Sequence, residues 1–211
     1  MDQITQTIDM DISTINRQLA GRSPEAIIQW ALSVAKRPVV TTNFRPYEAI
    51  ILHAVSIQAS DIPVVWCDTG YNTPSTYQHA DRTIKALKLN VDLFVPQQTV
   101  GYRNVTHGIP EIDTPEHDEF TLQVKLEPFK RAMDKHQPDV WFTNLRKEQT
   151  DFRGSLDIVS MSKDGVIKVS PFFHWTESEL DQYVDFNGLE SEDNYYDPTK
   201  ALANRECGLH S

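Results

Sequence analysis

Cysteine is scarce in this 211-residue chain, which contains only Cys67 and Cys207. Two thiols argue against a disulfide framework and fit a reducing compartment, so we expect a cytoplasmic protein. They are also too few to hold an iron–sulfur cluster, which usually takes four cysteine ligands. The scarcity of cysteine therefore predicts a fold without disulfide staples and a chemistry without such a cluster.

Long apolar runs and an excess of positive charge are missing as well. No apolar run approaches the roughly 18 residues that cross a membrane. The first residues, MDQITQTIDMDIS, lack the basic and apolar regions of a secretory signal. Acidic residues outnumber basic ones by 30 to 20, giving a net charge of −10. Because binding to nucleic-acid phosphates needs concentrated Lys and Arg, we expect neither a membrane nor a nucleic-acid partner.

Apolar, β-branched runs alternate with helical patterns along the chain. Two helices are predicted in the first 36 residues, the second with Ser23 as N-cap and Pro24 at its first position. The patterns then predict strands over 38–42, 62–67, 91–96 and 139–144. They predict helices over 47–58, 75–89, 122–136 (interrupted near Pro128) and 176–189. A loop is predicted over 97–119, and a hairpin over 156–171 that turns at 163–165. For the last helix we expect Thr176 and Glu179 to form a capping box and Gly188 to end it.

This alternation predicts an α/β fold with a mostly parallel, twisted sheet and helices on both faces. We expect one nucleotide-binding domain over residues 1–190 and a mobile C-terminal tail over 191–211. Ligands of such sheets bind beyond the carboxyl ends of the strands. The turns after Thr42, Cys67, Val95 and Thr143 should therefore line the site.

Polar side chains follow the first predicted strand. The hydroxyls of Thr41 and Thr42, the Asn43 amide and the backbone N–H groups of the next helix could cradle an anion, and Arg45 adds a cation. Pro46 removes one N–H and the loop contains no glycine. An ordinary strand-to-helix turn is therefore an open alternative.

A second turn, DTG, follows the second predicted strand. Asp68 could accept a hydrogen bond from a ribose or an adenine amino group, Thr69 lies beside it, and Gly70 permits a tight turn. An aspartate that caps the following turn is the alternative. Cys67, inside the predicted strand, is expected to be an inert packing thiol.

The basic residues gather in LRKEQTDFR, residues 145–153. Arg146 and Arg153 would share a face if this segment were helical, and guanidinium groups suit phosphate or sulfate oxygens. A solvated charged loop is the alternative interpretation.

The tail RECGLHS places Cys207 close to the C-terminus, between Arg205 and His210. A nearby cation or imidazolium lowers the pKa of a thiol and makes it more reactive. An incidental thiol, a disulfide with Cys67 and a metal-binding Cys/His pair are the alternatives. Two ligands are too few to indicate a zinc site, so no metal is predicted.

Taken together and in this order, the segments resemble the phosphoadenylyl-sulfate (PAPS) reductase family over roughly residues 25–211. The resemblance is carried by DIPVVWCDTGYNTPSTYQHADRTIKALKLNV, KLEPFKRAM, WFTNLRKEQTDFRGSLDIV, KVSPFFHW and RECGLH. It implies an adenine-nucleotide alpha-hydrolase-like fold, with residues 41–44 at the phosphosulfate end of the nucleotide and Asp68 and Thr69 near the adenosine. The substrate-binding residues implied are Thr41, Thr42, Asn43, Phe44, Arg45, Asp68, Thr69, Lys125, Arg146, Arg153, Arg205 and His210.

The resemblance also implies a reaction. Cys207 would attack the sulfonyl sulfur of PAPS and form an S-sulfocysteine, and a thioredoxin or glutaredoxin would then release sulfite. The enzyme would serve assimilatory sulfate reduction, need no metal or flavin, and form a homodimer. The related adenylyl-sulfate (APS) reductases carry a Cys-Cys…Cys-x-x-Cys motif that this chain lacks, which favours PAPS as the substrate.

The sequence departs from the family pattern at three places. Asn144 stands where the family commonly has glycine. TTNFRP stands where the family has a Ser-x-Ser-x-Gly-like loop. The segment LESEDNYYDPTKALANRE, between Gly188 and Cys207, is short and acidic where the family has basic residues near the 3′-phosphate. The choice between PAPS and APS therefore stays open. An adenylating ATP pyrophosphatase, which would need a Gly-rich loop, and a non-catalytic sulfonucleotide-binding relative are the alternative functions.

Overall fold

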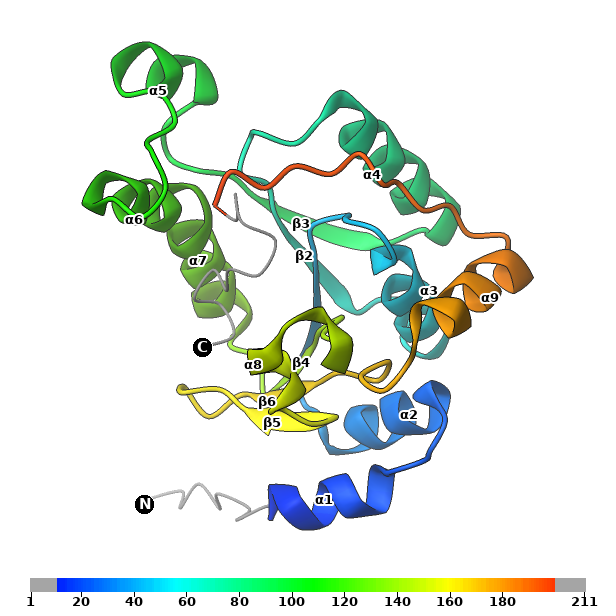
Figure 1. Cartoon of the computed structure of the whole chain (residues 1–211). Coiled ribbons are helices and arrows are strands. Elements are labelled where there is room, and N and C mark those ends of the chain that lie inside the picture. Colours follow the sequence, from blue (N-terminus) through cyan, green and yellow to red (C-terminus); the bar gives the residue numbers. More distant parts are fainter. Residues whose placement is uncertain (1–10, 200–211) are drawn as a thin grey trace.

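The structure, a computed structural model, describes residues 11–199 of the chain. Within this range six strands form one sheet in the order β3-β2-β1-β4-β6-β5 (Figure 1). The strands are β1 (Pro38–Thr42), β2 (Pro63–Cys67), β3 (Asn90–Phe94), β4 (Val140–Phe142), β5 (Val159–Met161) and β6 (Ile167–Val169). Neighbouring strands are parallel except for the β5–β6 pair. The predicted mostly parallel α/β sheet is confirmed.

Helices cover both faces of the sheet. On one face α3 (Glu48–Gln58) packs against β1 and is flanked by α2 (Pro24–Val34), α4 (Pro74–Leu87) and α9 (Glu177–Asn187). On the other face α7 (Glu127–His136) packs on β2 and β3 (Figure 1). Helix α1 (Ile12–Leu19) lies beside the edge strand β5, and its Ile15 and Leu19 belong to the main core on the α3 side. None of the helices in residues 11–199 is long and apolar enough to cross a membrane.

The side chains of β2 pack against helices on both faces of the sheet. Val64 and Trp66 belong to the main core on the α3 side, whereas Val65 packs with Phe94 and Ala132 on the α7 side. Side chains alternate between the faces of a strand, so a continuous apolar run has both faces buried. The same alternation leaves Cys67 on the α7 side, at the carboxyl edge of the sheet.

The stretch 97–119 is not the loop that the sequence predicts. It contains α5 (Val100–Thr106) and α6 (Pro115–Thr121), which begin at the N-caps Thr99 and Thr114. Each threonine hydroxyl accepts a hydrogen bond from a backbone N–H in the first turn of its helix. The local signal was present in TPEHD, where a capping threonine precedes proline and acidic residues. Because the stretch is polar overall, the sequence pattern favoured a loop over these two short helices.

The predicted helix over 122–136 is present, with an irregular first part. Residues Leu122–Leu126 form a π-helical turn, η1, that leads directly into α7. Pro128 is the second residue of α7, which directly follows the π-helical turn, so the widened turn accommodates the N–H that proline lacks. The interruption expected near this proline is therefore a widened turn and leaves the helical segment unbroken.

The C-terminal part of the predicted pattern is confirmed. The hairpin turns at Gly165, whose φ is +79°. Thr176 and Glu179 form the expected capping box of α9, and Gly188 ends the helix in the left-handed conformation. Short polar loops of this kind are set by local chemistry, which the sequence displays directly.

Residues 190–199, called the strap below, cross from α9 past α4 toward α6 and α7 (Figure 1). Glu190 pairs with Arg82 of α4, and the carbonyl of Asn194 accepts from the Thr73 hydroxyl at 2.7 Å. The Pro198 carbonyl meets His117 of α6 at 3.1 Å. The first residues of the predicted tail are therefore packed on the domain across the carboxyl edge of the sheet.

Candidate active site

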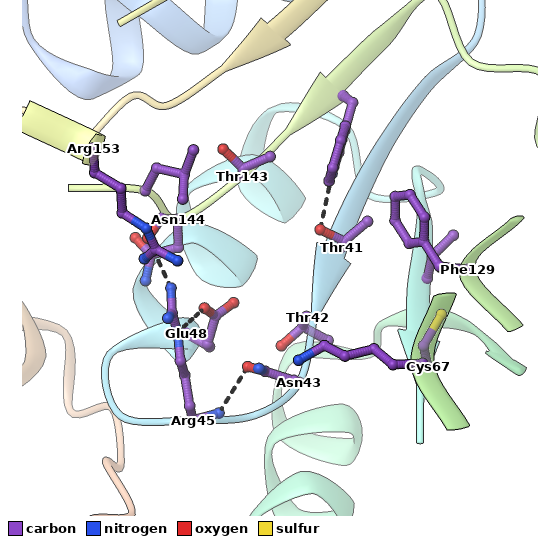
Figure 2. A pocket seen from close by; sticks show the side chains of 14 residues that line it. Thr41, Thr42, Asn43, Arg45, Glu48, Cys67, Phe129, Thr143, Asn144 and Arg153 are labelled. Carbon is purple, nitrogen blue, oxygen red and sulfur yellow. Dashed lines mark hydrogen bonds and ion pairs between the residues drawn. The ribbon is translucent and has the colours of Figure 1, made fainter. Parts of the chain in front are cut away.

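A pocket opens at the carboxyl ends of β1, β2 and β4, where the sequence predicts the site. It is lined by Thr41, Thr42, Asn43, Arg45, Glu48, Val65, Cys67, Lys125, Phe129, Trp141, Thr143, Asn144, Leu145 and Arg153 (Figure 2). The turns after Thr42 and Thr143 contribute as predicted, and the turn after Val95 does not. The cavity volume is about 80 Å³, well below the ~300 Å³ of a small ligand site. The enclosed space suits only the anionic end of a nucleotide.

The loop after β1 is shaped by two residues with positive φ. Phe44 has a φ of +53° and Tyr47 a φ of +66°. The Thr42 hydroxyl accepts from the Phe44 N–H at 3.0 Å, and the Phe44 ring meets Trp66 edge-to-face at 4.8 Å. Phe44 is fully buried, so its ring does not face a ligand. The Thr41 hydroxyl accepts from the Trp141 indole at 2.9 Å and is thereby fixed on the pocket wall.

Two residues, Glu48 and Asn144, hold the Arg45 side chain at the rim of the pocket. Its Nε donates to Glu48 at 2.8 Å, and one Nη donates to the Asn144 carbonyl at 3.1 Å (Figure 2). The Asn144 amide donates in turn to the Tyr47 carbonyl at 3.1 Å. Glu48 and Asn144 were not predicted as site residues. The spacing of three positions between Arg45 and Glu48 was a local signal for their ion pair, whereas the contact of Arg45 with Asn144 spans 99 positions and has no local signal. They fix the direction of the Arg45 guanidinium.

Lys125 enters the pocket from η1 and is bound to the strap. Its Nζ donates to Asp197 at 2.5 Å and to the Thr199 hydroxyl at 3.2 Å. Both charged side chains are more than nine-tenths buried. Burial alone would raise the pKa of Asp197, but the charge and hydrogen bonds of Lys125 and the bonds from Thr199 outweigh it and lower that pKa below its usual value. The acidic strap thus anchors the predicted phosphate-binding lysine.

The two predicted arginines of the third loop take different positions. Arg153 is buried, lines the pocket and donates to the Gln149 side chain. Arg146 does not line this pocket. Its guanidinium lies over the Tyr47 ring at 5.0 Å, and burial, aided by nearby Arg45, lowers its pKa. The segment is split into the 3₁₀ turn η2 (Lys147–Gln149) and the short helix α8 (Asp151–Gly154), so the two arginines do not share a helical face.

Asp68 and Thr69 are buried in the DTG turn and do not line the pocket. One Asp68 oxygen accepts from the Gly70 N–H and from the Asn72 amide, both at 2.8 Å. The Tyr77 hydroxyl lies 3.0 Å from both carboxylate oxygens. The carboxylate therefore organises the turn, and a role toward adenosine stays a prediction.

Cys67 lies on the pocket wall as a shielded thiol. Burial raises its pKa to about 12, although Lys125 and Arg131 partly oppose that shift. The thiol is therefore protonated near neutral pH and a poor nucleophile. In the part of the chain that the structure describes, no three His, Cys, Asp or Glu side chains are grouped to hold a metal ion. Arg205, Cys207 and His210 lie outside residues 11–199, so their predicted roles stay predictions.

The sequence of the chain matches a known family over most of its length. Residues 37–197 fit the family model of the phosphoadenosine phosphosulfate reductase domain. The chain belongs to this family. A phosphoadenosine 5′-phosphosulfate reductase of Xanthomonas euvesicatoria is 30% identical over 98% of this chain and 95% of its own length. The corresponding enzyme of Xylella fastidiosa strain M12 is 33% identical over 85% of this chain and 76% of its own length.

Solved structures agree on the fold. The PAPS reductase of Candida auris, in complex with phosphate, superposes with a TM-score of 0.74 at 22% identity, over 85% of this chain and 86% of that one. An FMN adenylyltransferase of Candida glabrata in complex with ATP gives 0.55 at 12% identity, over 86% of this chain and 58% of that one. The α/β fold expected from the resemblance is confirmed.

Proposed function

We propose that the protein is a PAPS reductase of assimilatory sulfate reduction. It converts PAPS to sulfite and adenosine 3′,5′-bisphosphate with Cys207 as nucleophile and thioredoxin or glutaredoxin as electron donor. The observation that carries the proposal is the convergence, in a chain of this family, of Thr41, Arg45, Lys125 and Arg153 on one pocket at the carboxyl edge of the sheet. Such a concentration of cations is notable in a chain with a net charge of −10.

The first step is transfer of the sulfonyl group. The Cys207 thiolate attacks the sulfur, an S–S bond forms, and the S–O bond to the 5′-phosphate breaks. The electron pair of that bond leaves with the phosphate oxygen, so negative charge grows there. Lys125, Arg45 and Arg153 line the pocket in which this charge would be stabilised.

The second step is reduction by the redoxin. A thiolate of the redoxin attacks Cys207 Sγ, and sulfite leaves with the electron pair of the S–S bond. The second redoxin thiol then resolves the mixed disulfide, which returns the Cys207 thiol and leaves the redoxin oxidised. Two electrons pass from the redoxin to the sulfur, so no bound redox cofactor is required.

The small volume of the pocket and the apolar residues in its lining favour this chemistry. Trp141 and Phe129 lie with ring centroids 5.1 Å apart and contribute apolar surface to the pocket wall. Exclusion of water strengthens each charge interaction and limits hydrolysis of the activated sulfate. Lys125 can meet the substrate anion by sharing or exchanging its contacts with the strap.

The test is sulfite release from PAPS and from APS with thioredoxin supplied. We expect sulfite from the wild-type protein and none from Cys207→Ser, which should still bind adenosine 3′,5′-bisphosphate. Incubation of the wild type with PAPS without a redoxin should add one sulfonate mass to the tryptic peptide of Cys207. Full activity of Cys207→Ser, or the sulfonate on Cys67, would overturn the mechanism.

Homodimer formation and a cytoplasmic location remain part of the proposal. They follow from the family resemblance and from the scarcity of cysteine. Sedimentation of the purified protein at several concentrations tests the first. Fractionation of cells tests the second.

A further inference from the structure

Helix α5 carries a buried arginine that the proposed reaction does not use. Arg103 is only 2% exposed. Its Nε and Nη1 atoms are buried, and within residues 11–199 no hydrogen-bond acceptor meets either of them. Its guanidinium lies 5.9 Å from the centre of the Phe120 ring. Arg103 was not singled out from the sequence, where it looked like part of a polar loop.

A buried guanidinium without a hydrogen-bond acceptor destabilises the protein when no ligand is bound. A guanidinium stays protonated at any physiological pH, so burial cannot neutralise it. A buried charge without a partner loses its hydration, and a ring face replaces only a small part of it. Arginine presents parallel N–H donors that match two oxygens of a phosphate. The side chain is therefore built to receive an anion that arrives with a ligand.

Arg103 lies directly beside the DTG turn. An added Cβ on Gly70 would stand 2.4 Å from Val100 Cγ2, so α5 packs closely on this turn. The Tyr71 hydroxyl donates to Asn104, next to Arg103, at 2.9 Å. Tyr71 also meets Phe120 at 5.6 Å between ring centroids. The turn expected near the adenosine and the buried arginine thus belong to one packed unit.

The group formed by Arg103, Tyr71 and Phe120 is also connected to the strap. His117 is fully buried, its ring centroid is 5.9 Å from that of Phe120, and its Nε2 meets the Pro198 carbonyl at 3.1 Å. A carbonyl only accepts, so Nε2 must carry the proton. Asp197, one residue earlier, holds Lys125 of the pocket. A chain of contacts through Phe120 and His117 therefore connects Arg103 to the strap, whose Asp197 holds Lys125 of the pocket.

We propose that Arg103 binds a second phosphate group of the substrate, the 3′-phosphate of the nucleotide. This inference rests on the proposed function, in which the small pocket takes the phosphosulfate end and the DTG turn lies near the adenosine. The strap brings Glu190, Glu192, Asp193 and Asp197 and so offers no positive charge to a 3′-phosphate. Arg103 supplies that charge from α5 instead.

The test compares nucleotides that differ only in the 3′-phosphate. Calorimetric titration with adenosine 3′,5′-bisphosphate, AMP and inorganic phosphate is carried out on the wild type, on Arg103→Met and on Arg17→Met. Arg17 is an exposed arginine of α1 and serves as the matched control. We expect Arg103→Met to weaken the bisphosphate about 10- to 100-fold, as loss of charge-assisted hydrogen bonds does, and to leave AMP unchanged. Arg17→Met should change neither.

Thermal unfolding without ligand separates binding from support of the fold. Because Arg103→Met removes an unpaired buried charge, its melting temperature should equal or exceed that of the wild type. A clear drop would make Arg103 a structural residue and overturn the inference. Equal weakening of AMP and the bisphosphate, or no weakening at all, would do the same.

The remaining outcomes separate a failure of this inference from a failure of the proposed function. If inorganic phosphate stabilises the wild type and not Arg103→Met, while both bind the two nucleotides equally, the site takes free phosphate and the nucleotide assignment is wrong. If the wild type binds neither nucleotide, the proposed function itself fails. If it releases sulfite from PAPS but Arg103→Met retains the wild-type preference for the bisphosphate, only this inference fails.

Discussion

Lys125 and Asp197 form a buried ion pair with an Nζ–Oδ2 distance of 2.5 Å, across 72 positions of sequence. The lysine faces the candidate active site and the aspartate belongs to the strap. One contact therefore joins a predicted substrate-binding residue to the segment that leads to Cys207. Its strength should influence both the stability of the fold and the position of the strap.

Asp197→Asn should destabilise the protein by about 3 kcal/mol, because it leaves the Lys125 ammonium buried without its counter-charge. Urea unfolding at pH 7 measures this change. The control is Asp134→Asn, which breaks an exposed pair with Lys130 on α7. The control should leave the unfolding midpoint unchanged, as exposed pairs contribute little. Equal midpoints for Asp197→Asn and the control would contradict the buried pair.

The double variant Lys125→Met/Asp197→Leu separates stability from catalysis. Removing both charges avoids the unpaired ion, so stability should return close to that of the wild type. Sulfite release should still fall about 100-fold, as expected when one charged donor is lost from a site that stabilises developing charge. Wild-type kcat/KM in this double variant would show that Lys125 only anchors the strap.

The same pair predicts a pH dependence. The pKa of Asp197 is lowered from its usual 3.8 in the folded protein, so folding favours the carboxylate. The resulting stabilisation is complete above that usual value and is lost as the pH falls below it toward the lowered pKa. The difference in urea midpoint between wild type and Asp197→Asn should therefore be constant from pH 7 to 5 and shrink below pH 4. A difference that grows on acidification would have the wrong sign.

The two cysteines should differ sharply in reactivity. With its pKa raised to about 12, the Cys67 thiol has a thiolate fraction of roughly one in ten thousand at pH 8. Iodoacetamide should therefore modify Cys207 in the native protein and reach Cys67 only in guanidinium chloride. Peptide mass spectrometry reads the result. Alkylation of native Cys67 at the rate of Cys207 would contradict the shielded thiol.

Gly70 should be far less tolerant than Gly101, although the two lie near the same helix. Gly70 has a φ of +82° and its added Cβ would meet Val100 at 2.4 Å, so Gly70→Ala should cost about 2 kcal/mol. Gly101, inside α5, has no atom within 4 Å of an added Cβ. Gly101→Ala should leave stability unchanged or raise it by about 0.5 kcal/mol. Chemical unfolding of both variants tests the packing of α5 on the DTG turn.

The sequence by itself determined the sheet, most of the helices and the edge at which the site lies. Ser23 and Thr176 cap helices as predicted, and β1, β2 and β4 end where the polar turns begin. These features depend on neighbours within about four positions, so local chemistry is sufficient to reveal them. The helices α5 and α6 were within reach of the same signals and were missed because their surroundings are polar.

Only the tertiary structure decided which polar residues meet. The positive φ of Phe44 directs its ring into the core. Asp68 forms hydrogen bonds within its own turn. Arg153 lines the pocket and Arg146 does not. The tertiary structure also paired Lys125 with Asp197 and buried Arg103 away from any acceptor in residues 11–199. Such relations join segments far apart in the chain. They depend on how packed layers bring side chains together, and no local pattern of residues encodes that.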